Sequence, residues 1–284
     1  MSALTPDHDA SMTFHLQAHT RPPGLLEVAA ERLGARLVED RLVVRGSRPS
    51  VGAPTTRGTW ARISWCPPSK VFAREFSGLE ASVAVRDVPK PSFIQATHWM
   101  NEGLVCRAEE MTFIGEPVIS TAYTLDKAPE LTDQWWEELS TALESLAGTD
   151  TDRVSLTQED INRSIREAFG TSIDTNVSRW VIGHGDLHWA NLTAPRLSLL
   201  DWDSWGLMPR GLDAAKLWES AFRVPALTEE ITERWAPDLA CRDGKVSRLW
   251  VCANRVLGAR RRGKVNDQTE HASRVGKSLL SELS

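Results

Sequence analysis

Apolar positions recur every three or four residues in several stretches of the chain, and this spacing predicts amphipathic helices. Most of these stretches are followed by a glycine or by polar residues, which are common helix stops. The predicted helices cover residues 25–33, 135–146, 157–169, 249–257 and 275–283.

Between residues 35 and 113 the pattern changes to short apolar runs broken by glycine, proline and aspartate, as in β-strands and their turns. Residues 59–65 alternate between apolar and other side chains, which predicts a strand with one buried face. Residues 37–38 and 42–44 flank a polar turn and predict a hairpin. Further strands are expected at residues 104–106 and 111–114.

These two patterns divide the chain into a front and a back part. Residues 1–114 are expected to form a small lobe built on an antiparallel sheet, and residues 115–284 a larger helical lobe. The predicted fold class is therefore α+β with two lobes. A cleft between two lobes is a common place for a ligand.

Composition narrows the classes of function. The chain has 284 residues and a formal net charge of −5, and no apolar run reaches the ~18 residues of a membrane helix. A negatively charged chain lacks the clustered positive surface that general nucleic-acid binding requires. The four cysteines have no metal-ligand spacing, and the first 21 residues do not resemble a secretory signal. We therefore expect a cytoplasmic protein that binds neither nucleic acid nor membranes.

Charge is distributed unevenly along the chain. Residues 116–240 carry 22 acidic and 10 basic side chains, whereas residues 241–284 carry 4 acidic and 10 basic ones. The field of an acidic region attracts cationic ligands, although acidic helices that only keep the surface soluble have the same composition.

The segment from Trp180 to Asp213 carries the candidate chemistry, and it reads WVIGHGDLHWANLTAPRLSLLDWDSWGLMPRGLD. An apolar run leads into a glycine-containing loop that presents Asp186. Asn191 and Asp201 follow on either side of a turn. A hairpin there would place them nearly opposite each other, with Cβ atoms roughly 5 Å apart.

An amide oxygen beside a carboxylate offers hard ligands that suit Mg²⁺. Asp186 stands at the mouth of the same unit as a third oxygen-bearing side chain. Two metal ligands, with a carboxylate that orients the attacking hydroxyl, are the parts that phosphoryl transfer from ATP requires.

At these residues the chain resembles the aminoglycoside phosphotransferase and choline kinase superfamily, through HGDLHWAN, LLDWD and PRGLDAAKLW. The resemblance implies a two-lobed protein-kinase-like fold with the active site in the cleft. It implies that Asp186 is the catalytic carboxylate. Asn191 and Asp201 would bind the metal ions. His184 would brace the catalytic loop, and Asp213 would anchor it.

The front lobe departs from the superfamily pattern. It has no G-x-G-x-x-G and no strand lysine of the V-A-I-K type. The nearest substitute is Arg62, whose guanidinium would hold phosphate oxygens of the nucleotide. Its partner acid would be Glu80, with Glu75 as the second choice. The alternative is that Arg62 is a solvated strand residue.

Four more residues near Asp186 are candidates for substrate binding: His188, Trp189, Asp203 and Trp205. The tryptophans could attract an ammonium group by cation–π contact, and core packing is the alternative. His188 could instead stabilise the loop by a hydrogen bond, and Asp203 could assist at a second metal ion. The spacing of His184 and His188 also occurs in helical zinc sites, but the flanking glycines disfavour a helix here.

Taken together, the motif and its resemblance predict an ATP- and Mg²⁺-dependent O-phosphotransferase, with GTP as the alternative donor. The acceptor would be a hydroxyl of a small cationic molecule, first an aminoglycoside or a basic cyclic peptide, as for an antibiotic-resistance kinase. A kinase of choline, a sugar or an amino alcohol is the second hypothesis. A catalytically silent kinase-like binding module is the third, because the glycine loop and the strand lysine are missing. The sequence fits a monomer or a dimer.

Overall fold

A computed structural model of the protein describes most of the chain. Residues 1–20, in which no secretory signal is expected, lie outside the described part, as does Glu75. No helix of the described part is long and apolar enough to cross a membrane. The described residues are 21–45, 49–71, 76–170 and 173–284.

The chain forms two compact units. Unit 1 comprises Met1–Val83 and Pro91–Gly115, and unit 2 comprises Ala84–Lys90 and Glu116–Ser284. The short segment of unit 2 that precedes Pro91 is therefore separated in sequence from the rest of its unit. Each unit has its own secondary structure.

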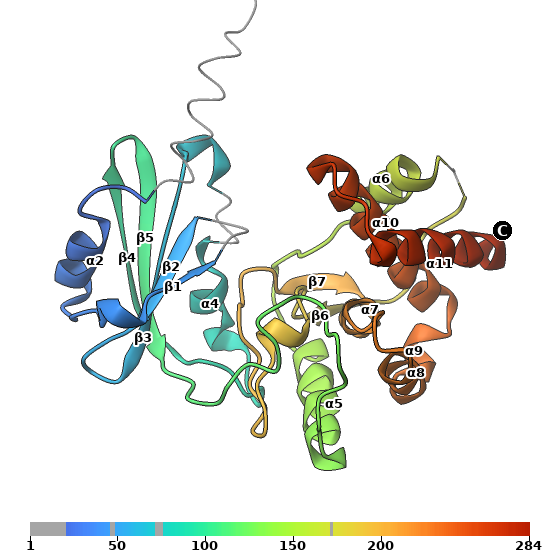
Figure 1. Ribbon diagram of the computed structural model, residues 1–284, viewed down its shortest axis with the longest axis horizontal. Helices are drawn as coiled ribbons and strands as arrows, with labels where there is room; N and C mark the ends of the chain where they lie inside the picture. Colours follow the sequence, from blue (N-terminus) through green and yellow to red (C-terminus); the bar gives the residue numbers. More distant parts are fainter. Residues whose placement is uncertain (1–20, 46–48, 72–75, 171–172) are drawn as a thin grey trace, which may run out of the picture. The chain divides into compact units, whose positions relative to one another are not determined.

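Unit 1 is built on a five-stranded antiparallel sheet with the strand order β1-β2-β3-β5-β4. Helix α2 (Leu25–Leu33) lies on one side of this sheet, and the short helix α4 (Gly78–Ala81) lies on the other (Figure 1). The strands are β1 (Val43–Arg45), β2 (Ser50–Pro54), β3 (Thr59–Cys66), β4 (Phe93–Asn101) and β5 (Leu104–Thr112). Short 3₁₀ turns are η1 (Glu39–Arg41), η2 (Pro68–Lys70) and η3 (Ser82–Ala84).

The alternation along β3 determines which face of the sheet is buried. Ala61, Ile63 and Trp65 point toward α2 and are buried in a core with its leucines. Arg62 lies on the opposite face, since successive side chains of a strand point to opposite sides. The predicted strand at residues 59–65 and the predicted helix at residues 25–33 are both confirmed.

The hairpin predicted from residues 37–38 and 42–44 is wrong. The two segments do not pair with each other, because both pair with residues 52–55. Leu37 pairs with Thr55, and Val43 pairs with Gly52. Six residues of the first chain segment therefore lie opposite only three of the second. The polar residues between them form η1, which takes up the difference and continues the chain in the same direction. A polar run of three residues is therefore a 3₁₀ insertion in one edge of the sheet.

A buried carboxylate ties α2 to the sheet. Glu110 on β5 accepts hydrogen bonds from Arg57, Gln95 and Thr59 at 2.5–2.7 Å. Arg57 and Gln95 also donate to the carbonyl oxygen of Leu33 at the end of α2. Burial alone would raise the pKa of Glu110, but these three donors and the charge of Arg57 lower it below its ordinary value of 4.5.

We expect the Glu110→Gln variant to lose a pH-dependent part of the stability. A carboxylate whose pKa is lowered on folding stabilises the fold above its unfolded pKa and loses this effect as the pH falls through the folded value. At pH 7 the variant should unfold with a free energy lower by about 1.5 kcal/mol, because hydrogen bonds to a charge are replaced by neutral ones. Urea unfolding should show that this difference in the free energy of unfolding between parent and variant decreases below about pH 4.5. A difference that stays constant down to pH 3 would contradict a lowered pKa of Glu110.

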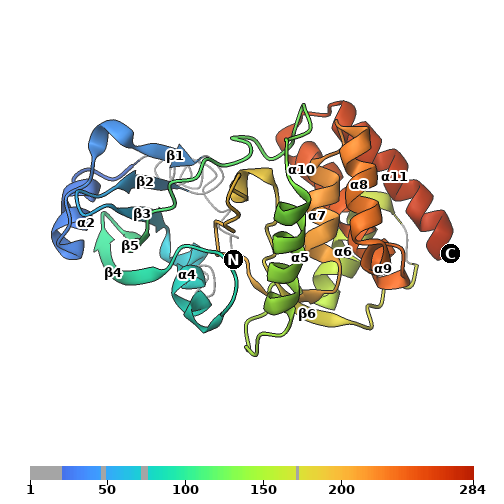
Figure 2. The same ribbon diagram turned by 90° about the horizontal axis from the view of Figure 1, so that it is seen from below.

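Unit 2 contains a two-stranded antiparallel ladder, β6 (Trp180–Gly183) with β7 (Gly206–Pro209), and a set of helices. The long α10 packs against α6, α7, α9 and α11 (Figure 2). The helices predicted from periodicity at residues 135–146, 249–257 and 275–283 lie within observed helices, and the one predicted at residues 157–169 is α6, with Thr157 as its N-cap. Those observed are α5 (Asp133–Ala147), α6 (Gln158–Phe169), α7 (Leu212–Ser220), α8 (Pro225–Arg234), α9 (Ala236–Leu239), α10 (Arg242–Arg262) and α11 (Asp267–Leu283).

Candidate active site

The candidate catalytic loop follows directly after β6, and a carboxylate of α7 holds it through backbone N–H groups. The N–H groups of His184 and Gly185 donate to the two carboxylate oxygens of Asp213, at 2.6 and 2.9 Å. Asp213 is buried in the first turn of α7, where the helix dipole also favours a negative charge. A Cβ atom on Gly183 would lie 2.7 Å from Asp213 Oδ2, so a side chain there would displace this carboxylate.

Gly185 is required by both its backbone conformation and its surroundings. Its φ is +76°, and a Cβ atom would lie 2.3 Å from the carbonyl oxygen of Ser204. We expect Gly185→Ala to lower the free energy of unfolding by about 4 kcal/mol, because the left-handed conformation costs an L residue about 1–2 kcal/mol and the overlap with Ser204 adds about 1–3 kcal/mol. Gly170→Ala is the matched control, since Gly170 has a φ of +68° with nothing within 4 Å of a Cβ. Equal losses in the two variants, measured by urea unfolding, would show that the contact with Ser204 has no effect.

Asp186 is surrounded by hydrogen-bond donors. Lys216 Nζ lies 3.3 Å from its Oδ1, and His188 Nε2 lies 3.5 Å from its Oδ2. Asn191 Nδ2 donates to the main-chain oxygen of Asp186 at 3.0 Å and to Oδ2 at 3.3 Å. Thirty-five per cent of the Asp186 side chain remains exposed, so the carboxylate can still be reached from solvent.

These neighbours keep Asp186 ionised. Burial by itself would raise the pKa of Asp186, but the charge of Lys216 and the hydrogen bond and charge of His188 lower it far below its ordinary value. A carboxylate of this kind is a hydrogen-bond acceptor throughout the neutral range. It is suited to orienting a hydroxyl group.

Asn191 lies in η4 (Trp189–Asn191) and has an oxygen left over. Its Nδ2 serves Asp186, whereas its Oδ1 is buried and has no hydrogen-bond partner. A buried oxygen without a donor is costly unless something binds it. Oxygen ligands are what Mg²⁺ prefers, so the residues present fit a magnesium ion. Among the described residues, no cluster of three or more histidines, cysteines and acids could hold a metal by itself.

The two segments predicted to form a hairpin do pair, in a register shifted by one residue. Leu192 bridges Leu199, and the N–H of Leu200 donates to the carbonyl oxygen of Asn191 at 2.8 Å. Leu200 is therefore opposite Asn191, and Asp201 comes next along the chain. Asp201 has a φ of +63°, a left-handed conformation that is uncommon for a residue other than glycine. Such strained positions concentrate at functional sites.

His184 occupies the interior of the loop. It is fully buried, its ring meets the ring of Trp202 edge to face, and neither ring nitrogen has a hydrogen-bond partner. Burial lowers its pKa, although Asp213, Asp186 and Asp201 act in the opposite direction. Three acids of the motif therefore lie within electrostatic reach of one neutral imidazole.

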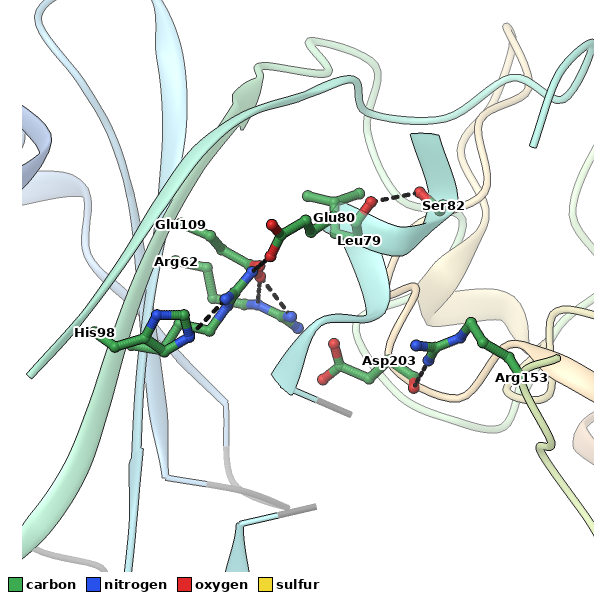
Figure 3. A network of polar contacts seen from close by, with 9 residues as sticks. Arg62, Leu79, Glu80, Ser82, His98, Glu109, Arg153 and Asp203 are labelled. Carbon is green, nitrogen blue, oxygen red and sulfur yellow. Dashed lines mark hydrogen bonds and ion pairs between the residues drawn. The ribbon is translucent and has the colours of Figure 1, made fainter. Parts of the chain in front are cut away.

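The tryptophans of the motif lie in the core. Trp189 is 0% exposed and packs against Trp136, and Trp205 is 1% exposed. Neither tryptophan offers a ring face to a cation from solvent. Their burial agrees with the alternative of core packing and not with a substrate-binding wall. The cation over Trp205 is Arg153, at 4.8 Å from the ring centroid. Arg153 also donates to the main-chain oxygen of Asp203, whose carboxylate points away from it (Figure 3).

Tyr123 belongs to the site and was not expected from the sequence. The chain before it runs along the catalytic loop, with hydrogen bonds from Ile119 N to Leu192 O and from Ser120 N to Trp189 O. This brings the ring of Tyr123 to 4.6 Å from that of His188. No motif marks a single tyrosine in a loop, and sequence offers no signal for it.

In unit 1, Arg62 and Glu80 belong to one chain of ion pairs (Figure 3). Arg62 donates to Glu109, which also accepts from Arg107 on the same strand β5. Arg107 in turn donates to Glu80 at 3.1 Å and lies 2.8 Å from His98. Arg107 and Glu109 therefore stand between the two residues that were expected to pair directly. The sequence singled out neither of them, because nothing in a local sequence shows that a charged strand residue is buried.

The structure is similar to those of several antibiotic phosphotransferases. A thermostable mutant of aminoglycoside phosphotransferase APH(4)-Ia, in a ternary complex with AMP-PNP and hygromycin B, superposes with a TM-score of 0.64 at 11% identity, covering 91% of this chain and 98% of that chain. Macrolide 2′-phosphotransferase from Brachybacterium faecium gives 0.55 at 18% identity, covering 89% and 97%. Spectinomycin phosphotransferase, in complex with ADP and spectinomycin, gives 0.51 at 13% identity, covering 91% and 94%.

At these identities the similarity establishes the fold. The chain has the kinase-like fold of small-molecule phosphotransferases, an antiparallel N-terminal sheet followed by a helical C-terminal region, as the sequence predicted. No family model matches the sequence, and no curated protein matches it.

Proposed function

We propose that the protein is an ATP- and Mg²⁺-dependent O-phosphotransferase that acts on a hydroxyl group of a small molecule. The observation that carries this proposal is the surroundings of Asp186 and Asn191. One loop presents a partly exposed, ionised carboxylate and, beside it, a buried amide oxygen without a hydrogen-bond partner. The kinase-like fold supports the same reaction class.

Each residue of the loop then has a part in the transfer. Asp186 accepts a hydrogen bond from the acceptor hydroxyl and turns its oxygen toward the γ-phosphorus. Asn191 holds Asp186 in place through Nδ2. Asp213 fixes the backbone on which both stand. Arg62 would bind phosphate oxygens of the nucleotide, and Glu80 would support it through Arg107.

A magnesium ion would be held by Asn191 Oδ1 and Asp201, together with the phosphates of the nucleotide. When bound, it would neutralise charge on the β- and γ-phosphates. GTP is the alternative donor. A solved neighbour of the same fold is a complex with GDP and kanamycin.

The acceptor we propose is cationic, in the first instance an aminoglycoside or a basic cyclic peptide. The acidic composition of residues 116–240 supports this, as do the hygromycin B and kanamycin in the complexes of neighbours with this fold. An antibiotic acceptor would make the protein a resistance kinase. Choline, sugars and amino alcohols are the second class of acceptor.

The test is transfer of labelled γ-phosphate from ATP to a panel of aminoglycosides, basic cyclic peptides, macrolides, choline, sugars and amino alcohols. We expect a labelled product that requires both the acceptor and Mg²⁺, and only slow residual transfer by Asp186→Ala. Transfer by Asp186→Ala at the parent rate would contradict the assigned carboxylate. If only a sugar or choline were labelled, the antibiotic acceptor would be wrong and the protein would be a kinase of the second class of acceptors.

Thermal unfolding with millimolar Mg²⁺-ATP distinguishes the enzyme from a silent kinase-like module. A ligand that binds only the folded state raises the unfolding temperature by mass action. We expect an increase with ATP or GTP. The absence of any increase with either nucleotide, together with no product, would favour the silent module.

A further inference from the structure

Helix α7 is buried along almost its whole length and yet carries three charged residues. Asp213, Lys216 and Glu219 follow each other at intervals of three, so they lie along one side of the helix. Charged side chains are almost never buried unless they are paired. Asp213 holds the backbone of the catalytic loop, and Glu219 is paired with Arg255 of α10.

Lys216 is the middle residue of this series and its partner is Asp186. Its ammonium lies 3.3 Å from Asp186 Oδ1 and 6.0 Å from the ring centroid of Trp250 on α10. Only 16% of its side chain is exposed. Most lysines keep their ammonium in water and bury only the stem. This lysine instead gives up rotamer freedom and hydration to reach one oxygen of one carboxylate.

We propose that Lys216 is a positioning residue for the phosphoryl transfer, and that its ammonium fixes the Asp186 carboxylate in the orientation that receives the acceptor hydroxyl. This inference rests on the proposed function. In the transfer, a lone pair of the acceptor oxygen forms the new bond to the γ-phosphorus. The bond from that phosphorus to the bridging oxygen breaks, and its electron pair leaves with ADP. The hydroxyl proton passes to Asp186.

The geometry favours Lys216 for this task over the other donors at Asp186. His188 and Asn191 belong to the same loop as Asp186, so their contacts with it do not connect that loop to another element. Lys216 projects from a helix that packs against α8, α9 and α10, and it joins the carboxylate to that rigid frame. A side chain on a fixed element restricts the reacting group, and a displacement of about 1 Å can cost a hundredfold in rate.

The first experiment compares Lys216→Met with Lys245→Met as the matched control. Lys245 is also on a unit 2 helix and is paired with an acid, Glu282 at 3.0 Å. We expect Lys216→Met to lower kcat about 100-fold with little change in KM for either substrate. Lys245→Met should keep the parent kcat. A Lys216→Met kcat within tenfold of the parent would overturn the inference, while the proposed function would stand.

A second variant separates the charge from the packing. Lys216→Cys should be as slow as Lys216→Met, and alkylation with 2-bromoethylamine should restore kcat because it rebuilds an ammonium at nearly the same reach. The neutral adduct formed with iodoacetamide should not restore it. The parent is treated identically, since Cys241 is exposed and would be alkylated as well. No recovery with the ammonium adduct would overturn the inference.

The double variant tests whether Lys216 acts through Asp186. We expect Asp186→Ala and Asp186→Ala with Lys216→Met to have the same residual kcat, because effects of residues that act as a unit do not add. A further loss in the double variant would mean that Lys216 acts on the phosphate itself, which would overturn the positioning role. Failure of the parent protein to transfer phosphate to any acceptor would refute the proposed function first, and this inference with it.

Discussion

Asp186→Asn is expected to lower kcat about 1,000-fold while the protein remains folded, because proton-accepting and orienting groups contribute between a hundredfold and ten-thousandfold. Asparagine has the shape of aspartate and keeps one oxygen that can face Lys216. It loses the negative charge and the second acceptor oxygen, to which Asn191 donates. The acceptor hydroxyl then lacks a group that attracts its proton.

The measurement is steady-state transfer at saturating ATP and acceptor, with thermal unfolding of the same preparations. Asp238→Asn is the matched control, because Asp238 is also a unit 2 aspartate paired with a cation, Arg210 at 2.7 Å, and has no part in the loop. It should keep the parent kcat. A kcat of Asp186→Asn within tenfold of the parent would show that another group receives the proton.

The parts of this structure that follow from local rules were predictable. The helices of unit 2 could be read from apolar spacing because each buries one stripe of side chains. Thr157, for example, caps α6 and forms a capping box with Asp160. The loop around Asp186 was located because glycines at positions 183 and 185 are needed for close contacts and a left-handed turn.

The parts that depend on distant pairing were not predictable. Strand β4 was missed, because its side chains are mostly half-buried or exposed and show no apolar run. The strands expected at residues 104–106 and 111–114 are parts of one continuous strand that ends at Thr112. Its buried residues Arg107, Glu109 and Glu110 all form ion pairs. A sequence does not reveal the partner that makes a buried charge acceptable. The same holds for Lys216, whose partner is thirty residues away.

The short segment Ala84–Lys90 gives a further example. It precedes two strands of unit 1 and yet contacts the motif in unit 2. Pro89 accepts a hydrogen bond from the N–H of Leu199, and the ammonium of Lys90 lies 5.7 Å from the ring centroid of Trp202. Burial lowers the pKa of Lys90. Nothing in the local sequence indicates that this loop supports the ring packed on His184.

Asp213→Ala is expected to reduce both stability and activity. It leaves the N–H groups of His184 and Gly185 without an acceptor, and both residues are buried. Unsatisfied buried donors cost 1–3 kcal/mol each, so the free energy of unfolding should fall by about 3 kcal/mol. The loop that carries Asp186 also loses its attachment to α7, and kcat of the folded protein should fall about 100-fold.

Asp243→Ala is the control that separates these two effects. Asp243 likewise accepts two backbone hydrogen bonds in unit 2, from Ser178 and Arg179 at 3.0 and 2.8 Å. Those residues are exposed, so water can replace the lost acceptor, and the free energy of unfolding should fall by only about 1 kcal/mol. Its kcat should not change. If Asp213→Ala, assayed well below its unfolding temperature, had the same kcat as Asp243→Ala, then Asp213 would stabilise the fold without positioning Asp186.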